Sequence, residues 1–364
     1  MKIAFNYFDG PNIFNVPGIG DHVVEVMMIY GLLNLPGEHQ VLVNGRCLQG
    51  DNSEYTTNLY RKLAVHPRVT LTETTFRRFN ASDLVNAKPV GDTVADIFFC
   101  SPAWLPIVDP DNSKTLYPDI DRSTLHVLPH VAPFTRPGQV SPQEETTGYR
   151  HVMDAFAWKI RQTFPEYKIP EPSLGWFTDV RISSDYSQFR PNQNYAIVKN
   201  ITVPNPHYPP FETGQHYIAI QIETGHPEKT PGPKVWNNLA QALIDQGENV
   251  VFLGPSSVRK ELFNLVCKAH PRRAHNLVGK TTLAQSFGLV QGAKAYFGGD
   301  TGLTHFASAS GIPTISLFGG FTDHTVMGPY WHQMYVVQVK STPPTCNPKN
   351  LIKKYHQAIA RLTP

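Results

Sequence analysis

The chain has 364 residues, of which 41% are hydrophobic, and this length predicts two domains rather than a single core. Its formal net charge of +3 is too weak a bias to predict nucleic acid or an anionic membrane as a partner. The four cysteines lie far apart in the sequence and show neither a zinc-binding spacing nor a disulfide framework. Because we find no signal-peptide pattern and no apolar run of membrane-spanning length, we expect a soluble, cytoplasmic protein.

The first half of the sequence alternates strands with helices, as an α/β domain does. A strand is expected at 2–8, followed by a loop rich in Gly, Pro and Asn and by a helix over 21–34 with apolar residues on one face. Further elements are expected as strands at 40–44, 69–72, 95–100 and 125–131 and as a helix at 149–164. We therefore expect one Rossmann-like domain over 1–203.

The segment 201–210 is so rich in proline that it predicts neither regular helix nor a central strand. We take 204–215 as the linker between the domains. A second α/β domain is expected over 216–340, and 341–364 is expected as a C-terminal helix that packs back toward the first domain. The elements expected after the linker are strands at 216–222, 249–253, 293–297 and 314–318, and helices at 235–246, 257–270, 281–291, 303–310 and 350–362.

The most informative stretch is 297–318, where a glycine-rich helix start lies between two apolar strands. Asp300 or Thr301 is the expected N-cap, and the glycines around them, Gly302 included, let a ligand approach the backbone closely. A helix that starts at the C-terminal end of a parallel strand favours phosphate binding. His305 lies one turn into the helix on the face of Thr301. The alternative is that Asp300 only caps the helix and His305 packs in the core.

Two further residues are candidates for the same cleft. Lys234 directly precedes the expected helix at 235–246, where its ammonium group could meet a phosphate as a point charge, although a surface lysine would also fit this position. Asp21 begins the first helix after Gly18-Ile19-Gly20. It suits either a helix N-cap or a general base that accepts the proton of an attacking hydroxyl.

The second half resembles glycosyltransferase family nine, the lipopolysaccharide heptosyltransferases, over 217–339. The first half resembles the family more weakly, through Gly20-Asp21-His22-Val23-Val24 and the helix at 149–164. In the second half the matching elements, in order, are Lys234-Val235-Trp236, the strand 250–253 ending in Gly254, 276–283, 300–305 and 311–319.

The resemblance implies the GT-B architecture, two Rossmann-like domains facing across a cleft, with the acceptor bound by the first domain. It implies inverting transfer from a nucleotide-diphospho-sugar, which acts as co-substrate, with no cofactor and no catalytic metal. Asp21 matches the family's proposed base. In the donor site, Lys234, Thr301 and Gly302 would hold the diphosphate, Asp300 and His305 would address the sugar and its phosphate, and Gly254 and Glu223 would complete the site.

The sequence departs from the family pattern in three segments that surround the expected donor and acceptor sites. The loop 8–20 is longer than usual, 223–225 replaces small residues, and 319–323 carries an extra residue. Heptose and ADP are therefore left open. We expect a lipopolysaccharide-type or other surface glycan as the acceptor, with peripheral membrane association. The alternatives are a hydroxylated DNA base or a protein as acceptor, a nucleotide-sugar-binding module without turnover, and an epimerase.

Overall fold

A computed structural model gives the structure of the chain, which falls into two compact units. The first contains residues 1–133 and 140–183, and the second contains 134–139 and 184–364. The linker expected at 204–215 lies outside the described residues, so the domain boundaries stay predictions. The residues that the structure describes are 1–5, 8–9, 19–47, 60, 63–75, 88–89, 95–100, 123–127, 135–167, 216–255 and 263–361.

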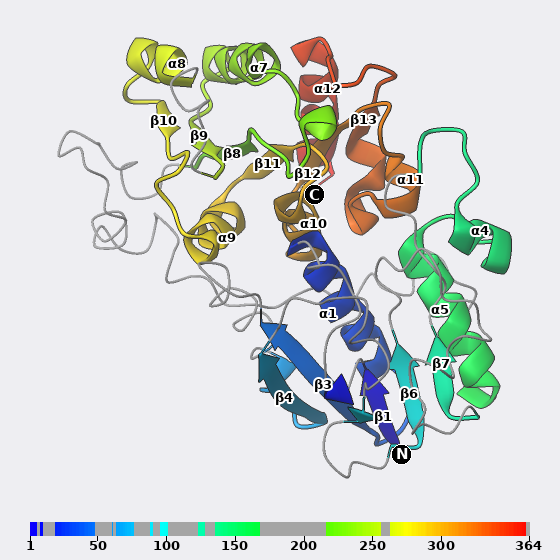
Figure 1. Cartoon of the computed structure of the whole chain (residues 1–364). Coiled ribbons are helices and arrows are strands. Elements are labelled where there is room, and N and C mark those ends of the chain that lie inside the picture. Colours follow the sequence, from blue (N-terminus) through cyan, green and yellow to red (C-terminus); the bar gives the residue numbers. More distant parts are fainter. Residues whose placement is uncertain are drawn as a thin grey trace. The chain divides into compact units, whose positions relative to one another are not determined.

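The first unit is built on a parallel five-stranded sheet in the order β4-β3-β1-β6-β7 (Figure 1). The central strand β1 is short and apolar, and Ile3, Ala4 and Phe5 are fully buried, as expected for a strand covered on both faces. A separate antiparallel pair joins β2 (Phe8–Asp9) to β5 (Lys88–Pro89). The sheet strands are β1 (Lys2–Phe5), β3 (Gln40–Cys47), β4 (Val69–Thr75), β6 (Ile97–Cys100) and β7 (Leu125–Val127).

Helix α1 (Ile19–Leu33) contacts both β3 and α5 (Val152–Thr163). The ring of Phe156 on α5 packs edge-on against Phe5 of β1 and Phe99 of β6, which ties this helix to the sheet. The unit also contains α4 (Pro142–Thr147), which begins with a capping box and ends at Gly148, and the short helix η2 (Pro165–Tyr167).

The second unit is built on a parallel six-stranded sheet in the order β10-β9-β8-β11-β12-β13. Its central strands β8, β11 and β12 are buried along their whole length, and all three coincide with strands that the sequence predicts. Because every pairing is parallel, the C-terminal ends of these strands meet at one edge. The strands are β8 (Ile218–Gln221), β9 (Val250–Leu253), β10 (Ala274–Asn276), β11 (Ala295–Gly298), β12 (Thr314–Phe318) and β13 (Val336–Gln338).

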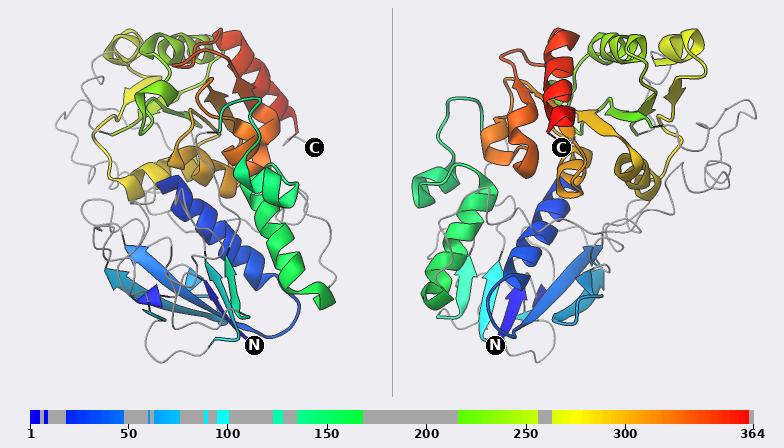
Figure 2. Two further views of the ribbon diagram at one scale, coloured as in Figure 1. Left: turned by 45° about the vertical axis from the view of Figure 1, so that its right-hand side comes forward. Right: turned by 180° about the vertical axis from the view of Figure 1, so that it is seen from behind.

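Helices α7 and α12 of the second unit pack side by side (Figure 2). Leu351, Ile352 and Tyr355 of α12 belong to the core of this unit, whereas its expected packing toward the first domain stays a prediction. None of the helices in the described ranges is long and apolar enough to cross a bilayer. The helices of the unit are η4 (Pro227–Lys229), α7 (Pro233–Asp245), α8 (Asn264–Ala269), α9 (Leu283–Gly292), α10 (Gly302–Ala309), α11 (His324–Met327), η6 (Tyr330–Tyr335) and α12 (Pro348–Ala360).

Candidate functional site

The candidate site lies at the C-terminal edge of the second unit's sheet. Glu223 follows β8, Gly254 follows β9 and Asp300 follows β11, so three of the predicted site residues come from neighbouring strands. Ligands of open α/β sheets bind at this edge, because loops and helix starts converge there.

Helix α10 begins at Gly302 with Thr301 as its N-cap. The Thr301 side chain accepts a hydrogen bond from the Thr304 N–H at 3.4 Å, so Thr301 rather than Asp300 caps the helix. The Thr304 hydroxyl donates to the Gly299 carbonyl at 2.6 Å, which fixes the turn from β11 into the helix. The first N–H groups of such a helix have no partner within it, and the helix dipole is positive there.

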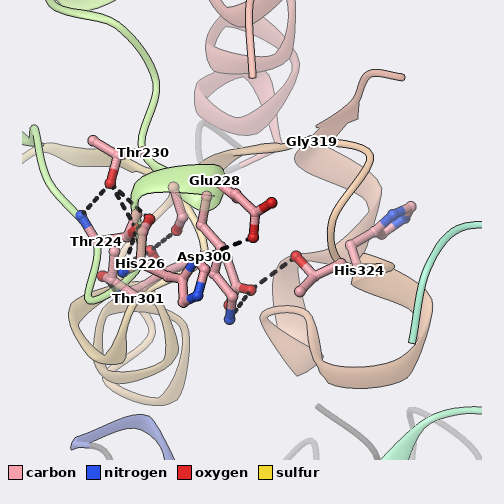
Figure 3. Close-up of polar contacts among 12 residues, drawn as sticks. Thr224, His226, Glu228, Thr230, Asp300, Thr301, Gly319 and His324 are labelled. Atoms are coloured by element: carbon pink, nitrogen blue, oxygen red, sulfur yellow. Dashed lines mark hydrogen bonds and ion pairs between the residues drawn. The ribbon is translucent and has the colours of Figure 1, made fainter. Parts of the chain in front are cut away.

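Asp300 links three loops through its carboxylate. Its Oδ2 lies 2.7 Å from the Lys229 Nζ in the loop after β8, and it accepts a hydrogen bond of 2.9 Å from the Thr322 hydroxyl in the loop after β12 (Figure 3). The side chains of Asp300 and Lys229 are only 11% and 15% exposed, so this pair is less screened by solvent than a surface ion pair. We call Lys229, Asp300 and Thr322 the Asp300 cluster.

His305 lies one turn into α10 and is buried. Burial lowers its pKa; the Asp300 carboxylate opposes this effect and the Lys229 ammonium adds to it. The imidazole is therefore neutral at pH 7, where one ring nitrogen can donate a hydrogen bond and the other can accept one.

The loop after β8 presents Lys229 through its own hydrogen bonds. The carbonyl of His226 accepts from the hydroxyls of Thr224 at 2.7 Å and Thr230 at 3.0 Å (Figure 3). The start of the loop is anchored by the buried Trp236 of α7, whose indole Nε1 donates to the Ile222 carbonyl at 3.2 Å. The position of Lys229 is thus set by the loop itself and by the core beneath it.

The loop after β12 is held by Gln338 at the end of β13. The side-chain amide of Gln338 donates to the carbonyls of Gly319 at 2.6 Å and Thr322 at 3.2 Å, and its oxygen accepts from the His324 N–H at 3.2 Å. A Cβ at Gly320 would overlap the Lys340 carbonyl oxygen, so only glycine allows the loop to follow this path. These contacts place Thr322 beside Asp300.

The structure brings Asp300, Thr301, Gly302 and His305 together, as the sequence predicts, and adds Lys229 and Thr322. Lys234 has an exposed side chain in the first turn of α7, and its role as a diphosphate ligand stays a prediction. The sequence pattern places the cation at the start of the following helix, at Lys234, and therefore misses Lys229 in the loop before it. The signal was a lysine in the loop directly after a buried strand.

The other predicted residues have less defined surroundings. Glu223 is half-buried, and its Oε2 has no hydrogen-bond partner among the described residues. A Cβ at Gly254 would lie 3.1 Å from the Ile222 side chain, so glycine permits close packing of the ends of β8 and β9. Asp21 is the third residue of α1, and its side chain lies outside the described part of the structure. In the described ranges no group of three or more His, Cys, Asp or Glu side chains is arranged to hold a metal ion.

GT-B glycosyltransferases are built from two units of this kind, each with its own parallel sheet. Residues 179–356 match the model of glycosyltransferase family 9 (heptosyltransferase). This part of the chain is a family 9 domain, and the resemblance found in its motifs is confirmed.

A curated relative matches part of the chain, and solved structures show its fold. The chain is 29% identical over 130 residues to lipopolysaccharide heptosyltransferase 2 of Escherichia coli K12; this match covers 35% of the chain and 37% of the relative. The fold is similar to the structure of E. coli ADP-heptose lps heptosyltransferase II, with a TM-score of 0.58, 14% identity and 100% of both chains covered. It is also similar to E. coli heptosyltransferase WaaC with ADP, with a TM-score of 0.55, 14% identity and coverage of 98% and 100%. The GT-B fold is thereby confirmed.

Proposed function

We propose that this protein is an inverting glycosyltransferase that moves a sugar from a nucleotide-diphospho-sugar to an acceptor hydroxyl. The observation that carries the proposal is the Asp300 cluster at the start of α10, in a segment that is a family 9 domain. A helix start with a neutral imidazole one turn in, and a cation from the neighbouring loop, are groups that recognise a diphosphate and the sugar attached to it.

The donor binds with its diphosphate at the start of α10. The N–H groups that follow Thr301, beginning at Gly302, and the ammonium groups of Lys229 and Lys234 face the phosphate oxygens. Asp300 and His305 address the sugar and its phosphate. Glu223 and Gly254, toward β9, border the nucleoside. ADP is the first nucleotide to try, because the similar WaaC structure is described as holding it.

In the reaction, Asp21 accepts the proton of the acceptor hydroxyl while the hydroxyl oxygen attacks the anomeric carbon of the donor. The bond from this carbon to the diphosphate oxygen breaks, and the nucleoside diphosphate leaves with the bonding electrons. A single displacement inverts the configuration at the anomeric carbon. Fixed positive charge and N–H dipoles stabilise the charge that develops on the leaving diphosphate, which is the role a divalent cation plays in other transferases.

We propose a lipopolysaccharide-type glycan as the acceptor, because the curated relatives are named lipopolysaccharide heptosyltransferases. The enzyme would reach such an acceptor from the cytoplasm, through its own peripheral association with a membrane.

The test of the donor site is isothermal titration with ADP, GDP, UDP and CDP, each with and without EDTA. We expect one nucleotide to bind irrespective of EDTA. Lys229→Ala should weaken its binding about 10- to 100-fold, which corresponds to about 1.4 to 2.7 kcal/mol. The matched control is Lys353→Ala, an exposed lysine on α12, which should bind as the wild type does. Failure of all four nucleotides to bind, or unchanged binding by Lys229→Ala, would overturn the assignment.

A further inference from the structure

A pair of stacked rings joins two loops of the donor site. The imidazole of His226, after β8, and the phenyl ring of Phe321, after β12, have centroids 4.9 Å apart and planes inclined by 19°. In the sheet, β8 and β12 lie on either side of β11, which leads into Asp300. The stack therefore connects the two loops that flank the loop carrying Asp300.

The stack and the Asp300 cluster connect the same loops at neighbouring points. His226 precedes Lys229 by three residues, and Phe321 directly precedes Thr322. Lys229 and Thr322 both contact the Asp300 carboxylate. The stacked rings therefore belong to the same two loop segments as the side chains that hold the Asp300 carboxylate.

The stack is not part of the hydrophobic core. The His226 side chain is 43% exposed, and its Nδ1 lies 3.5 Å from the Glu228 carboxylate. Phe321 belongs to the loop that Gln338 holds at Gly319 and Thr322, so its backbone position is fixed from both sides. A ring pair that is accessible to solvent but held firmly has the properties of a binding wall rather than of core packing.

We propose that the His226–Phe321 stack is a specificity-determining wall of the donor's sugar site, which selects the sugar that fits beside Asp300. The inference rests on the proposed function. The diphosphate is held at the α10 start and by Lys229, so the stack governs recognition of the sugar and leaves the nucleoside diphosphate unaffected. Phe321 lies in 319–323, one of the segments that depart from the family pattern. The sugar that this chain selects can therefore differ from the sugar that other family members select.

The test compares the binding of ADP, ADP-glucose and ADP-glycero-manno-heptose to the full-length protein by titration calorimetry. We expect the wild type to prefer one sugar over the other by about tenfold or more, equivalent to about 1.4 kcal/mol. Phe321→Ala should reduce this preference to about threefold or less and leave the affinity for ADP unchanged. Phe321→Tyr, which keeps a stacking ring, should retain the wild-type preference. His356→Ala, which removes an exposed ring on α12, is the matched control.

The outcomes separate this inference from the function on which it rests. If ADP does not bind the wild type, the proposed donor site fails. If ADP binds but the wild type does not distinguish the two sugars, or Phe321→Ala distinguishes them as the wild type does, the specificity wall is overturned while the donor site stands. If Phe321→Ala lowers the affinity for ADP as much as for both sugars, the stack is only structural. The melting temperatures of Phe321→Ala and of a second variant, Phe321→Leu, show whether a loss of binding reflects unfolding.

Discussion

Burial keeps two histidines of the second unit uncharged near neutral pH. Burial lowers the pKa of His275 on β10 to about 4 from its ordinary 6.5, and the nearby Lys280 ammonium acts in the same direction. His305 on α10 has its pKa lowered by burial as well. Neutral imidazole in the folded state and imidazolium in the unfolded state make the stability of this unit dependent on pH.

His275 predicts the direction of that dependence. Because the folded state disfavours protonation of His275, the unfolding free energy keeps its full value above about pH 6.5 and decreases as the pH falls toward 4. One histidine contributes at most about 1.4 kcal/mol per pH unit, hence on the order of 1 to 2 kcal/mol between pH 6.5 and 5. Guanidinium unfolding at these two pH values should show a smaller loss for His275→Gln than for the wild type. An equal loss in both proteins would contradict this account, because it would show that His275 takes up protons equally in the folded and unfolded states.

Residues that are adjacent in the sequence could be predicted as a site, whereas residues brought together by the sheet could not. Asp300, Thr301 and His305 lie within one turn and a half of chain, so a helix start alone places them on one face. Lys229 and Thr322 reach Asp300 only because β8, β11 and β12 are neighbours in the sheet. This strand order depends on pairing between distant segments, which local patterns do not specify.

At the scale of elements, the loop after β12 depends on one side chain of the neighbouring strand. Gln338→Leu leaves the carbonyls of Gly319 and Thr322 without their donor, which should lower the unfolding free energy by about 1 to 3 kcal/mol. Because Thr322 would no longer be held beside Asp300, binding of the nucleotide-sugar should weaken as well. Thermal unfolding and donor titration measure the two effects. Gln357→Leu, on the exposed face of α12, should change neither; a Gln338→Leu protein that matches this control would refute the role of Gln338.

Helix α12 is held to the residues just before β9 and β11 by polar contacts that lie outside the Asp300 cluster. The Tyr355 hydroxyl donates to the Glu248 carboxylate at 2.6 Å, and this carboxylate also accepts from the Lys294 ammonium at 2.6 Å. Hydrogen bonds to charged groups contribute about 1.5 to 3 kcal/mol, so Tyr355→Phe should destabilise the second unit by about that amount. Chemical unfolding tests this. Nucleotide affinity should be unchanged, and a loss of affinity would connect α12 to the donor site.

The long elements of the second unit could be predicted from periodicity and end signals. The helix expected at 303–310 is found at Gly302–Ala309, and the strand expected at 314–318 has those bounds. Among the described residues of the second unit, five short elements were missed: η4, β10, α11, η6 and β13. Segments of three to six residues carry too little periodicity to be recognised, and the neighbouring strands decide whether they join a sheet.

At the scale of the whole molecule, each unit has its own parallel sheet and its own core, and the proposed reaction needs residues of both. The proposed donor site belongs to the second unit, which contains most of the family 9 match at 179–356. The proposed base, Asp21, belongs to α1 of the first unit. Sequence patterns predicted two α/β domains. The first half resembles the family only through the segment 20–24 and the helix at 149–164, so the acceptor stays a proposal.

The central claim is metal-independent, inverting displacement with Asp21 as the base. The most direct measurement uses water as the acceptor: ADP-heptose, or the nucleotide-sugar that binds best, is incubated with the enzyme in EDTA, and NMR follows the released sugar before its anomers equilibrate. We predict release of the nucleoside diphosphate together with the sugar of inverted configuration. Asp21→Asn should slow this release about 100-fold or more while binding the nucleotide as the wild type does. A retained configuration, a requirement for a divalent cation, or an Asp21→Asn enzyme as fast as the wild type would contradict the account.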